Sequence, residues 1–229
     1  MLKVLYEDNH IIVVIKPHNM PSQADDSKDK DLLSEVKNYI KEKYNKKGEA
    51  FVGLIHRLDR PTGGIMVFAK TSKAANRLSL QFKEHSTTKV YYAVCQGNIN
   101  KMQDTLVNYL KKDEKNNIVK IVSQSDKMAK KAELEYKVLE KNESLSLLQV
   151  KLLTGRSHQI RVQLAGINLG IYGDMKYNKN SKAGQNLALW AGRLEFNHPT
   201  TKERLVFLAM PDNTKEPWSK FYIEKYFVR

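Results

Sequence analysis

The segment from His56 to Gly64, His-Arg-Leu-Asp-Arg-Pro-Thr-Gly-Gly, holds the densest group of chemically useful side chains in the chain. Asp59 lies between Arg57 and Arg60. Pro61 restricts the backbone of this loop, and the paired glycines Gly63 and Gly64 allow backbone conformations that other residues avoid. Nearby positive charge favours the ionised form of a carboxyl group. We therefore expect Asp59 to be an anion that acts as a nucleophile or an electrostatic stabiliser. A structural Arg–Asp pair that closes a turn is the alternative for this segment taken alone.

His56 and Asp59 stand at a spacing that can bind a metal ion, but no companion pair of ligands stands out elsewhere in the sequence. Cys95 is the only cysteine, which excludes a cysteine-based metal cluster and an internal disulfide. We therefore expect His56 to be a hydrogen-bonded residue of the core, and we expect no metal and no other cofactor.

A second group of chemically useful residues runs from Thr154 to Leu164, Thr-Gly-Arg-Ser-His-Gln-Ile-Arg-Val-Gln-Leu. Ser157 is of a type that caps helices, and the apolar residues after it recur at helical spacing. On such a helix His158 and Arg161, three positions apart, lie on one side. An arginine held on a rigid helix can pair with a carboxylate or a phosphate in a forked geometry. The alternative is a surface helix with solvated cations.

Two adjacent tyrosines, Tyr91 and Tyr92, lie in the β-branched and aromatic stretch from 90 to 96. Successive side chains of a strand point to opposite faces, so one ring can pack in the core while the other meets a ligand. A ring at a binding site can stack on a nucleobase. Packing of both rings in the core is the alternative.

Hydrophobic periodicity predicts the elements that would position these groups. Short apolar or alternating runs predict strands, and apolar residues three and four apart predict helices. Thr71 or Ser72 is suited to cap the second helix. The pattern predicts an α+β fold with a mixed, largely antiparallel β-sheet core and flanking helices. The predicted strands are 2–6, 11–15, 65–69, 90–96, 133–140, 145–153, 187–191 and 205–209, and the predicted helices cover 32–40, 74–82 and the region after 157.

The chain of 229 residues carries 39 Lys and Arg against 25 Asp and Glu, a formal net charge of +14. Such an excess attracts polyanions and points to nucleic acid or an acidic membrane surface, although solubility alone is an alternative. The longest apolar run near the start, Ile11–Ile15, is far shorter than the roughly 20 residues that span a bilayer. Together with the single cysteine, this predicts a cytoplasmic protein without membrane attachment.

Residues 101–131 are rich in Lys, Asn, Asp and Ser. We interpret this stretch as an insertion or an RNA-facing loop within a single domain that spans 1–229, because the segments on both sides carry pieces of one site. Near the end of the chain, four aromatic residues at helical spacing predict a core-facing stripe: Trp218, Phe221, Tyr222 and Tyr226.

These residues resemble the RluA-type RNA pseudouridine synthases, and the resemblance runs over nearly the whole chain. The combination of the Asp loop and the Arg helix at this separation is specific. By this resemblance we expect a catalytic domain that begins almost at residue 1, without the small RNA-binding domain that many members carry in front. The matching segments are Tyr6–Asp8 through Lys16–Pro17, the His-Arg-Leu-Asp loop, the Lys-x-Tyr-x-Ala strand from Lys89, the Thr-Gly-Arg-Ser-His-Gln-Ile-Arg segment, Gly173–Asp174, and Leu189 through His198–Pro199.

The resemblance implies the pseudouridine synthase fold with a central active-site cleft, and it implies that Asp59 is the essential aspartate. Tyr91 matches the ring that stacks on the target base, and Arg161 matches the arginine that pairs with the aspartate. Arg57 matches an arginine that displaces or replaces the flipped nucleotide. Four neighbouring residues are further candidates for RNA contact or base flipping: Arg60, His56, Arg156 and His158.

By this resemblance the chain isomerises specific uridines of structured rRNA or tRNA to pseudouridine, with the target base flipped out of the helix. RNA is then the partner of a monomer, and no cofactor is needed. The alternative is a non-catalytic RNA-binding module that uses charge and aromatic rings only for recognition. RNA methylation is disfavoured because no glycine-rich nucleotide-binding turn follows a strand.

Overall fold

The computed structural model describes residues 2–142 and 144–227, and the chain forms two compact units. Unit 1 comprises residues 1–88 and 191–209, and unit 2 comprises residues 89–190 and 210–229. The chain therefore leaves unit 1 after residue 88, returns to it at residue 191, and ends in unit 2. That the two units act together as the single catalytic domain predicted for 1–229 stays a prediction.

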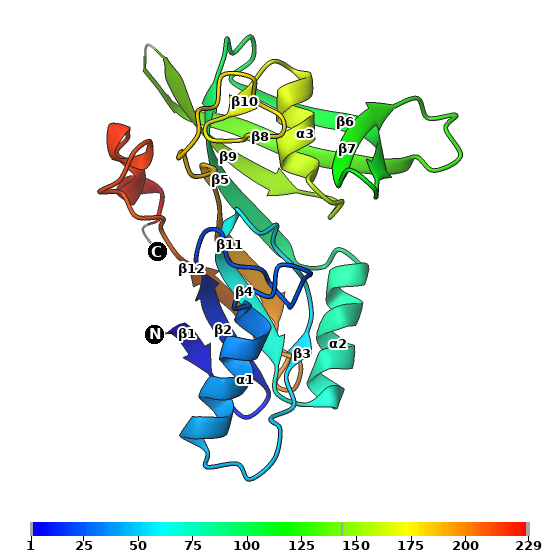
Figure 1. Cartoon of the computed structure of the whole chain (residues 1–229), viewed down its shortest axis with the longest axis vertical. Coiled ribbons are helices and arrows are strands. Elements are labelled where there is room, and N and C mark those ends of the chain that lie inside the picture. The colour runs from blue at the N-terminus through cyan, green and yellow to red at the C-terminus, as the bar shows by residue number, and fades with distance from the viewer. Residues whose placement is uncertain (1, 143, 228–229) are drawn as a thin grey trace. The chain divides into compact units, whose positions relative to one another are not determined.

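Unit 1 is built on strands in the order β1-β2-β4-β11, with β3 beside β4 and β12 beside β11 (Figure 1). β1 pairs with β2, β2 and β3 pair with β4, and β12 pairs with β11, all antiparallel. The elements are β1 (Lys3–Glu7), β2 (Ile11–Lys16), α1 (Leu32–Lys43), β3 (Gly53–Leu54), β4 (Gly63–Ala69), α2 (Ser72–Lys83), β11 (Leu189–Asn197) and β12 (Arg204–Leu208).

The two central strands of unit 1, β2 and β4, are buried along their whole lengths. Their continuous apolar runs, in place of alternation, fit strands that are covered on both faces. The helices begin where polar side chains accept from free backbone N–H groups. Asp31 accepts from Ser34 N at 3.0 Å to start α1, and Thr71 accepts from Ala74 N at 3.2 Å to start α2. The predicted cap at Thr71 is confirmed.

Unit 2 contains a second run of antiparallel strands in the order β5-β9-β8-β6-β7, with β10 beside β5. Helix α3 packs against β6, β7 and β10 (Figure 1). The elements are β5 (Thr88–Gln96), whose first residue still belongs to unit 1, β6 (Gln103–Asp113), β7 (Ile118–Val122), β8 (Lys130–Lys141), β9 (Leu145–Leu152), α3 (Gln159–Gly166), β10 (Gly170–Ile171) and the 3₁₀ turns η1 (Trp218–Lys220) and η2 (Ile223–Tyr226).

The predicted α+β class with a largely antiparallel sheet and flanking helices is confirmed, but the stretch 101–131 is not one loop. Residues 103–113 and 118–122 within it form the antiparallel pair β6 and β7. Leu106, Leu110 and Val119 point into the core while lysines occupy the solvent side. Because a half-exposed strand needs only one apolar face, the polar composition of the segment concealed it.

The aromatic residues near the C-terminus do not form the predicted helical stripe. Two short 3₁₀ turns, η1 and η2, stand there instead of an α-helix. Trp218 and Phe221 are buried, whereas Tyr222 is 78% exposed. The prediction of a core-facing stripe is therefore wrong at Tyr222.

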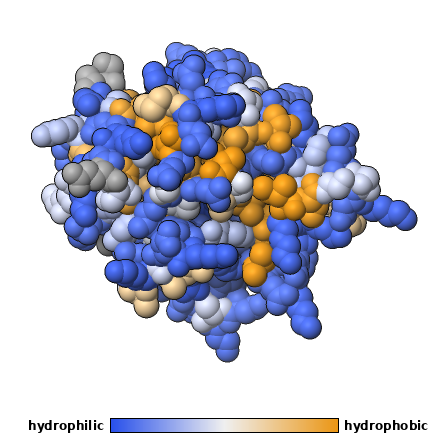
Figure 2. Space-filling view, turned by 90° about the horizontal axis from the view of Figure 1, so that it is seen from above, coloured by the Kyte–Doolittle hydropathy of each residue, from blue (hydrophilic) through white to orange (hydrophobic). Residues whose placement is uncertain are grey.

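The surface is mainly polar. Figure 2 shows a face on which hydrophilic side chains predominate and hydrophobic ones form a band between them. Large exposed apolar side chains in unit 2 include Val107, Met128 and Met175. Apolar surface of this kind is ordinary for a folded protein. In the part of the chain that the structure describes, no helix has the length and apolarity needed to cross a membrane.

Candidate active site

Asp59 lies on a turn of unit 1 that enters β4, and hydrogen bonds on both sides hold this turn. The backbone oxygen of Asp59 accepts from Thr62 N at 2.9 Å. The Ser22 hydroxyl donates to Leu58 O at 2.8 Å and accepts from Leu58 N at 3.1 Å. The Leu58 side chain is buried, whereas Asp59 is half-buried. The Asp59 carboxyl group is thus carried by backbone that is tied to a distant loop.

Lys16, the last residue of β2, is fully buried beneath the same turn. Its ammonium donates to the backbone oxygens of Pro17 at 3.1 Å, Met20 at 2.5 Å and Arg60 at 2.9 Å. Burial lowers the pKa of Lys16 to about 7, while the negative charge of Asp59 raises it and the positive charge of Arg60 lowers it. A buried amine therefore both shapes the turn and interacts electrostatically with the Asp59 carboxylate.

The second of the two glycines after the turn, Gly64, stands where no other residue type fits. Its φ of +126° lies in a region that L side chains rarely adopt. An added Cβ would also collide with the backbone oxygen and nitrogen of Ala191, on the neighbouring strand β11. Close approach of two backbones therefore requires glycine at this position, directly after the Asp59 turn.

The other predicted residues of this loop differ in their surroundings. His56 is half-buried, accepts from Val67 N at its Nε2 atom over 3.2 Å, and stacks on Phe82 with ring centroids 4.7 Å apart. This hydrogen bond agrees with the predicted hydrogen-bonded role of His56. Arg57 is exposed to solvent.

Arg60 is held by acidic and hydroxyl groups of the loop between β2 and α1. It donates to the Ser27 hydroxyl at 2.9 Å, forms an ion pair with Asp29, and lies 3.7 Å from the Asp25 carboxylate. These side chains are all substantially exposed. The arginine beside Asp59 thus connects the polar loop 22–31 to the turn that carries Asp59.

In unit 2 the start of α3 differs from the prediction. The N-cap is His158, with the left-handed φ of 51°, and Ser157 provides no cap. Instead, the Gln159 amide oxygen accepts from Arg156 N at 3.0 Å and from the Thr154 hydroxyl at 2.7 Å. A side chain within the helix therefore accepts from one backbone N–H and one hydroxyl before it, and the predicted cap at Ser157 is wrong.

Arg161 is almost fully buried and pairs with Asp174 in a forked geometry. Nε donates to Oδ2 at 2.8 Å and Nη2 donates to Oδ1 at 2.7 Å. The guanidinium also lies over the Tyr177 ring, 5.1 Å from its centroid. His158 reaches the same tyrosine, with Nδ1 2.7 Å from the Tyr177 hydroxyl. His158 and Arg161 therefore converge on Tyr177, as expected of neighbours, although His158 is not helical.

The pairing of Arg161 with Asp59 that the resemblance implies joins residues of two different units, and it stays a prediction. Arg156, also in unit 2, is exposed and donates from Nε to Lys131 O at 2.9 Å.

Tyr91 and Tyr92 point to opposite faces of β5 and are both largely buried. Tyr92 is 1% exposed, donates to Tyr226 O at 3.2 Å and packs on Phe227 with ring centroids 4.4 Å apart. Tyr91, opposite Val150 of β9, is 9% exposed. The prediction that one of the two rings belongs to the core is met by Tyr92, and base stacking by Tyr91 stays a prediction.

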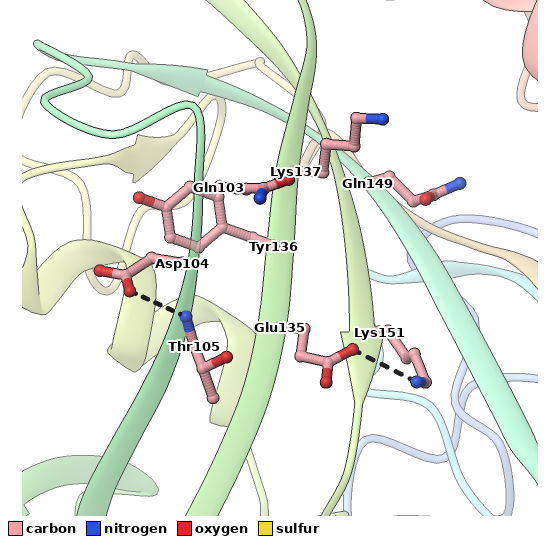
Figure 3. Close-up of a pocket in the computed structure, with 8 residues that line it drawn as sticks. All are labelled: Gln103, Asp104, Thr105, Glu135, Tyr136, Lys137, Gln149 and Lys151. Atoms are coloured by element: carbon pink, nitrogen blue, oxygen red, sulfur yellow. Dashed lines mark hydrogen bonds and ion pairs between the residues drawn. The ribbon is translucent and has the colours of Figure 1, made fainter.

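A groove lies on the strands β6, β8 and β9 of unit 2 (Figure 3). Its charged groups are mostly paired, Lys151 with Glu135 at 3.2 Å and Asp104 with Lys101 at 2.9 Å. This groove contains none of the residues predicted to act on RNA. It is lined by Gln103, Asp104, Thr105, Glu135, Tyr136, Lys137, Gln149 and Lys151.

Three residues that contact predicted site residues within their own unit were assigned no role from the sequence: Lys16, which binds Arg60, and Asp174 and Tyr177, which contact Arg161. The signal for Lys16 was a cation at the end of a wholly apolar strand, where a charge has to find buried partners. Asp174 follows a glycine, which marks a turn but does not say which side chain the carboxylate meets. Nothing in the local sequence singled out Tyr177.

Comparison with known proteins gives a consistent result. A family model described as RNA pseudouridylate synthase matches residues 10–166, a range that includes Asp59, Tyr91 and Arg161. The tRNA pseudouridine synthase C of Yersinia pestis is 32% identical over 240 residues, which cover 95% of this chain and 88% of that protein. The ribosomal large subunit pseudouridine synthase D of Borreliella burgdorferi is 34% identical over 183 residues, which cover 78% of this chain and 55% of that protein.

Solved structures agree with the sequence relatives. The structure of human RNA Pseudouridylate Synthase Domain Containing 4 matches with a TM-score of 0.78 and covers 93% of this chain and 89% of that one. Because the sequence identity is 21%, this likeness concerns the fold.

Proposed function

Because the chain belongs to the RNA pseudouridylate synthase family, we propose that it isomerises uridines of tRNA or ribosomal RNA with Asp59 as the catalytic carboxylate. The two sequence relatives described above are named for tRNA and for the large ribosomal subunit, so both RNA classes are candidate substrates. The formal charge of +14 suits a polyanionic substrate of either class.

The chemistry asks for a fixed anion next to the sugar. Pseudouridine formation breaks the bond between C1′ and uracil N1, turns the base, and joins C1′ to C5. The ribose passes through a state in which C1′ is short of electrons, and a carboxylate in a fixed position stabilises such a centre. A uridine within a helix is out of reach of any side chain, so the target base has to be flipped out.

The observation that carries the assignment of Asp59 is the support of its turn. Lys16 and Ser22 bind the backbone at Arg60 and Leu58, the residues on either side of Asp59. A half-buried carboxylate on a turn held from both sides has little freedom to move. Such preorganisation is costly for a residue that only closes a turn, but it is what a catalytic group requires.

The remaining roles follow from residue type and position. Tyr91, on the rigid strand β5, would stack on the flipped uracil. Arg161, held on α3, would pair with the Asp59 carboxylate, and the exposed Arg57 would fill the space that the flipped nucleotide leaves. Four further residues would contribute to RNA contact or base flipping: Arg60, His56, Arg156 and His158.

Tritium release from RNA labelled at uracil C5 tests this proposal, because C5 loses its hydrogen when it becomes the glycosidic carbon. We expect release by the wild-type protein without added cofactor. We expect Asp59→Asn to reduce the rate at least about 1000-fold while retaining RNA binding. Asp26→Asn, an equal change at an exposed position of loop 22–31, is the matched control and should keep the wild-type rate.

The outcomes separate the proposal from its rival. A non-catalytic RNA-binding module would bind RNA and release no tritium in any form. Full activity of Asp59→Asn would show that another group performs the chemistry. Supplying labelled tRNA and labelled large-subunit rRNA in separate reactions then identifies which RNA class is the substrate.

A further inference from the structure

The ion pair between Arg161 and Asp174 is the most deeply buried pair of opposite charges among those described above. The two side chains are 5% and 0% exposed. We propose that Asp174 is a positioning residue that sets the orientation of the Arg161 guanidinium. This inference rests on the proposed function, in which Arg161 acts together with Asp59 on the RNA.

The Asp174 carboxylate is oriented by its own backbone, independently of the arginine. Oδ1 accepts from Lys176 N at 3.1 Å and from Tyr177 N at 3.3 Å. The Asp174 backbone N donates to Ile171 O at 3.1 Å, and its backbone O accepts from Asn178 N at 2.9 Å. The tight turn that results holds the carboxylate through Oδ1, so its orientation is set before Arg161 binds it.

The residue before Asp174 shows how little this turn can shift. Gly173 has a φ of +74°, and a Cβ at this position would collide with the backbone oxygen of Asn186. Only glycine fits so close an approach between the turn and the chain near 186. The position of the Asp174 carboxylate is therefore determined by backbone packing on both sides.

Two kinds of contact restrict the Arg161 guanidinium, one within its plane and one on its face. The bonds from Nε and Nη2 to the two carboxylate oxygens fix the plane of the guanidinium, and the Tyr177 ring packs against its face. The Tyr177 hydroxyl accepts from Val119 N at 2.8 Å, which anchors this ring to β7. Of the five N–H groups of an arginine, two are used in this fork, and the geometry of the fork determines where the other three point.

The competing explanation is that the ion pair only stabilises the fold. The free energy of a buried ion pair argues against this explanation. A buried ion pair contributes little net stability, because desolvation of both charges offsets their attraction. What the fork does provide is directional precision, since a lysine or a shifted carboxylate could neutralise charge without fixing a plane. Precision matters when the arginine has to meet the substrate site in one orientation.

A double-mutant cycle on kcat for tritium release tests the proposal. Asp174→Asn keeps an acceptor for the backbone N–H groups of the turn but removes the charge, and Arg161→Lys keeps the charge but removes the fork. We expect each change to lower kcat about 100-fold and to alter KM for RNA less than about threefold. We expect the double variant to lie within about twofold of the weaker single variant, because both changes remove the same interaction.

The outcomes are distinct. If the two effects multiply, Asp174 does not act through Arg161 and the inference is overturned. Wild-type kcat in either single variant overturns it as well, and Asp174→Glu, which keeps the charge but shifts the carboxylate, takes the place of Asp174→Asn in the cycle if that variant fails to fold. Absence of tritium release by the wild-type protein would instead overturn the proposed function, and the inference with it. Asp104→Asn, which removes a carboxylate from the exposed pair with Lys101, should keep wild-type kcat.

Discussion

The ammonium of Lys16 donates a hydrogen bond to the backbone oxygen of Arg60, 2.9 Å away, although the two residues are 44 positions apart in sequence. This contact joins the end of β2 to the turn that carries Asp59. The same ammonium binds two carbonyls of its own loop, so a single buried group holds two segments in register. The geometry of the proposed catalytic carboxylate therefore depends on a residue outside its own loop.

Replacement of Lys16 should disable the enzyme by loosening this turn. We expect Lys16→Met to lower kcat for tritium release about 100-fold, because small displacements of a catalytic group are costly. Three carbonyls also lose a donor, which we expect to lower the free energy of unfolding by about 2 kcal/mol. Kinetics together with urea unfolding measure both effects.

The control for this change is Lys3→Met, at an exposed position of β1, which should leave both quantities near their wild-type values. Unchanged kcat in Lys16→Met would contradict the link between Lys16 and the position of Asp59.

The acidic loop next to Arg60 should compete with RNA. Asp29 pairs with the guanidinium that the sequence predicts to contact RNA, and a phosphate would have to take its place. We expect Asp29→Asn to bind RNA about threefold more tightly than Asp26→Asn at low salt, since an exposed ion pair has only a modest energy. Filter binding at several salt concentrations measures this difference.

Both substitutions change the net charge equally, so the comparison isolates the contact with Arg60. Equal affinities of the two variants would mean that Arg60 does not exchange the Asp29 carboxylate for RNA.

A stacking role for Tyr91 predicts a graded response. Tyr91→Phe keeps the ring and should retain part of the activity, whereas Tyr91→Leu should lose about tenfold more, in line with the energy of stacking on one base. The activities of the two variants are compared by their rates of tritium release at saturating RNA. Tyr222→Leu, at a ring that is 78% exposed, should behave as wild type. Equal losses in the two Tyr91 variants would argue against stacking.

Because of Glu7, the free energy of unfolding of unit 1 should decrease as the pH falls into the acid range. Burial acts to raise the pKa of Glu7, but hydrogen bonds from Lys43, Lys70 and Tyr44 outweigh it and lower this pKa from 4.5 to about 2. Folding therefore favours the ionised carboxylate, and the stabilisation is fully present above the unfolded pKa near 4.5. It is lost as the pH falls from there towards 2.

Urea unfolding at pH 7 and pH 3 tests this dependence. We expect Glu7→Gln to be about 2 kcal/mol less stable than wild type at pH 7, because the four hydrogen bonds that the charged carboxylate accepts are weakened, and the difference should shrink at pH 3. Glu49→Gln, at an exposed pair with Lys41, should show no such change. A constant difference between wild type and Glu7→Gln at both pH values would contradict the prediction.

Much of the fold followed from local patterns. The apolar runs 11–15 and 65–69 correspond to the buried strands β2 and β4, and the predicted cap at Thr71 starts α2. Such patterns are readable because burial of a whole strand or satisfaction of a helix end constrains residues that are adjacent in sequence. The strands at 103–113 and 118–122 were missed for the converse reason, since their exposed faces are polar and only a few positions carry the apolar signal.

The sequence by itself determined the family, through segments whose residue types and order are specific, and it singled out Asp59, Tyr91 and Arg161 as the residues to examine. Only the tertiary structure decided what holds them. Lys16 reaches Arg60 across 44 positions, and Arg161 reaches Asp174 across 13. The partners of a buried charge are chosen by the path of the chain in space, because desolvation penalises any charge that packing leaves without them.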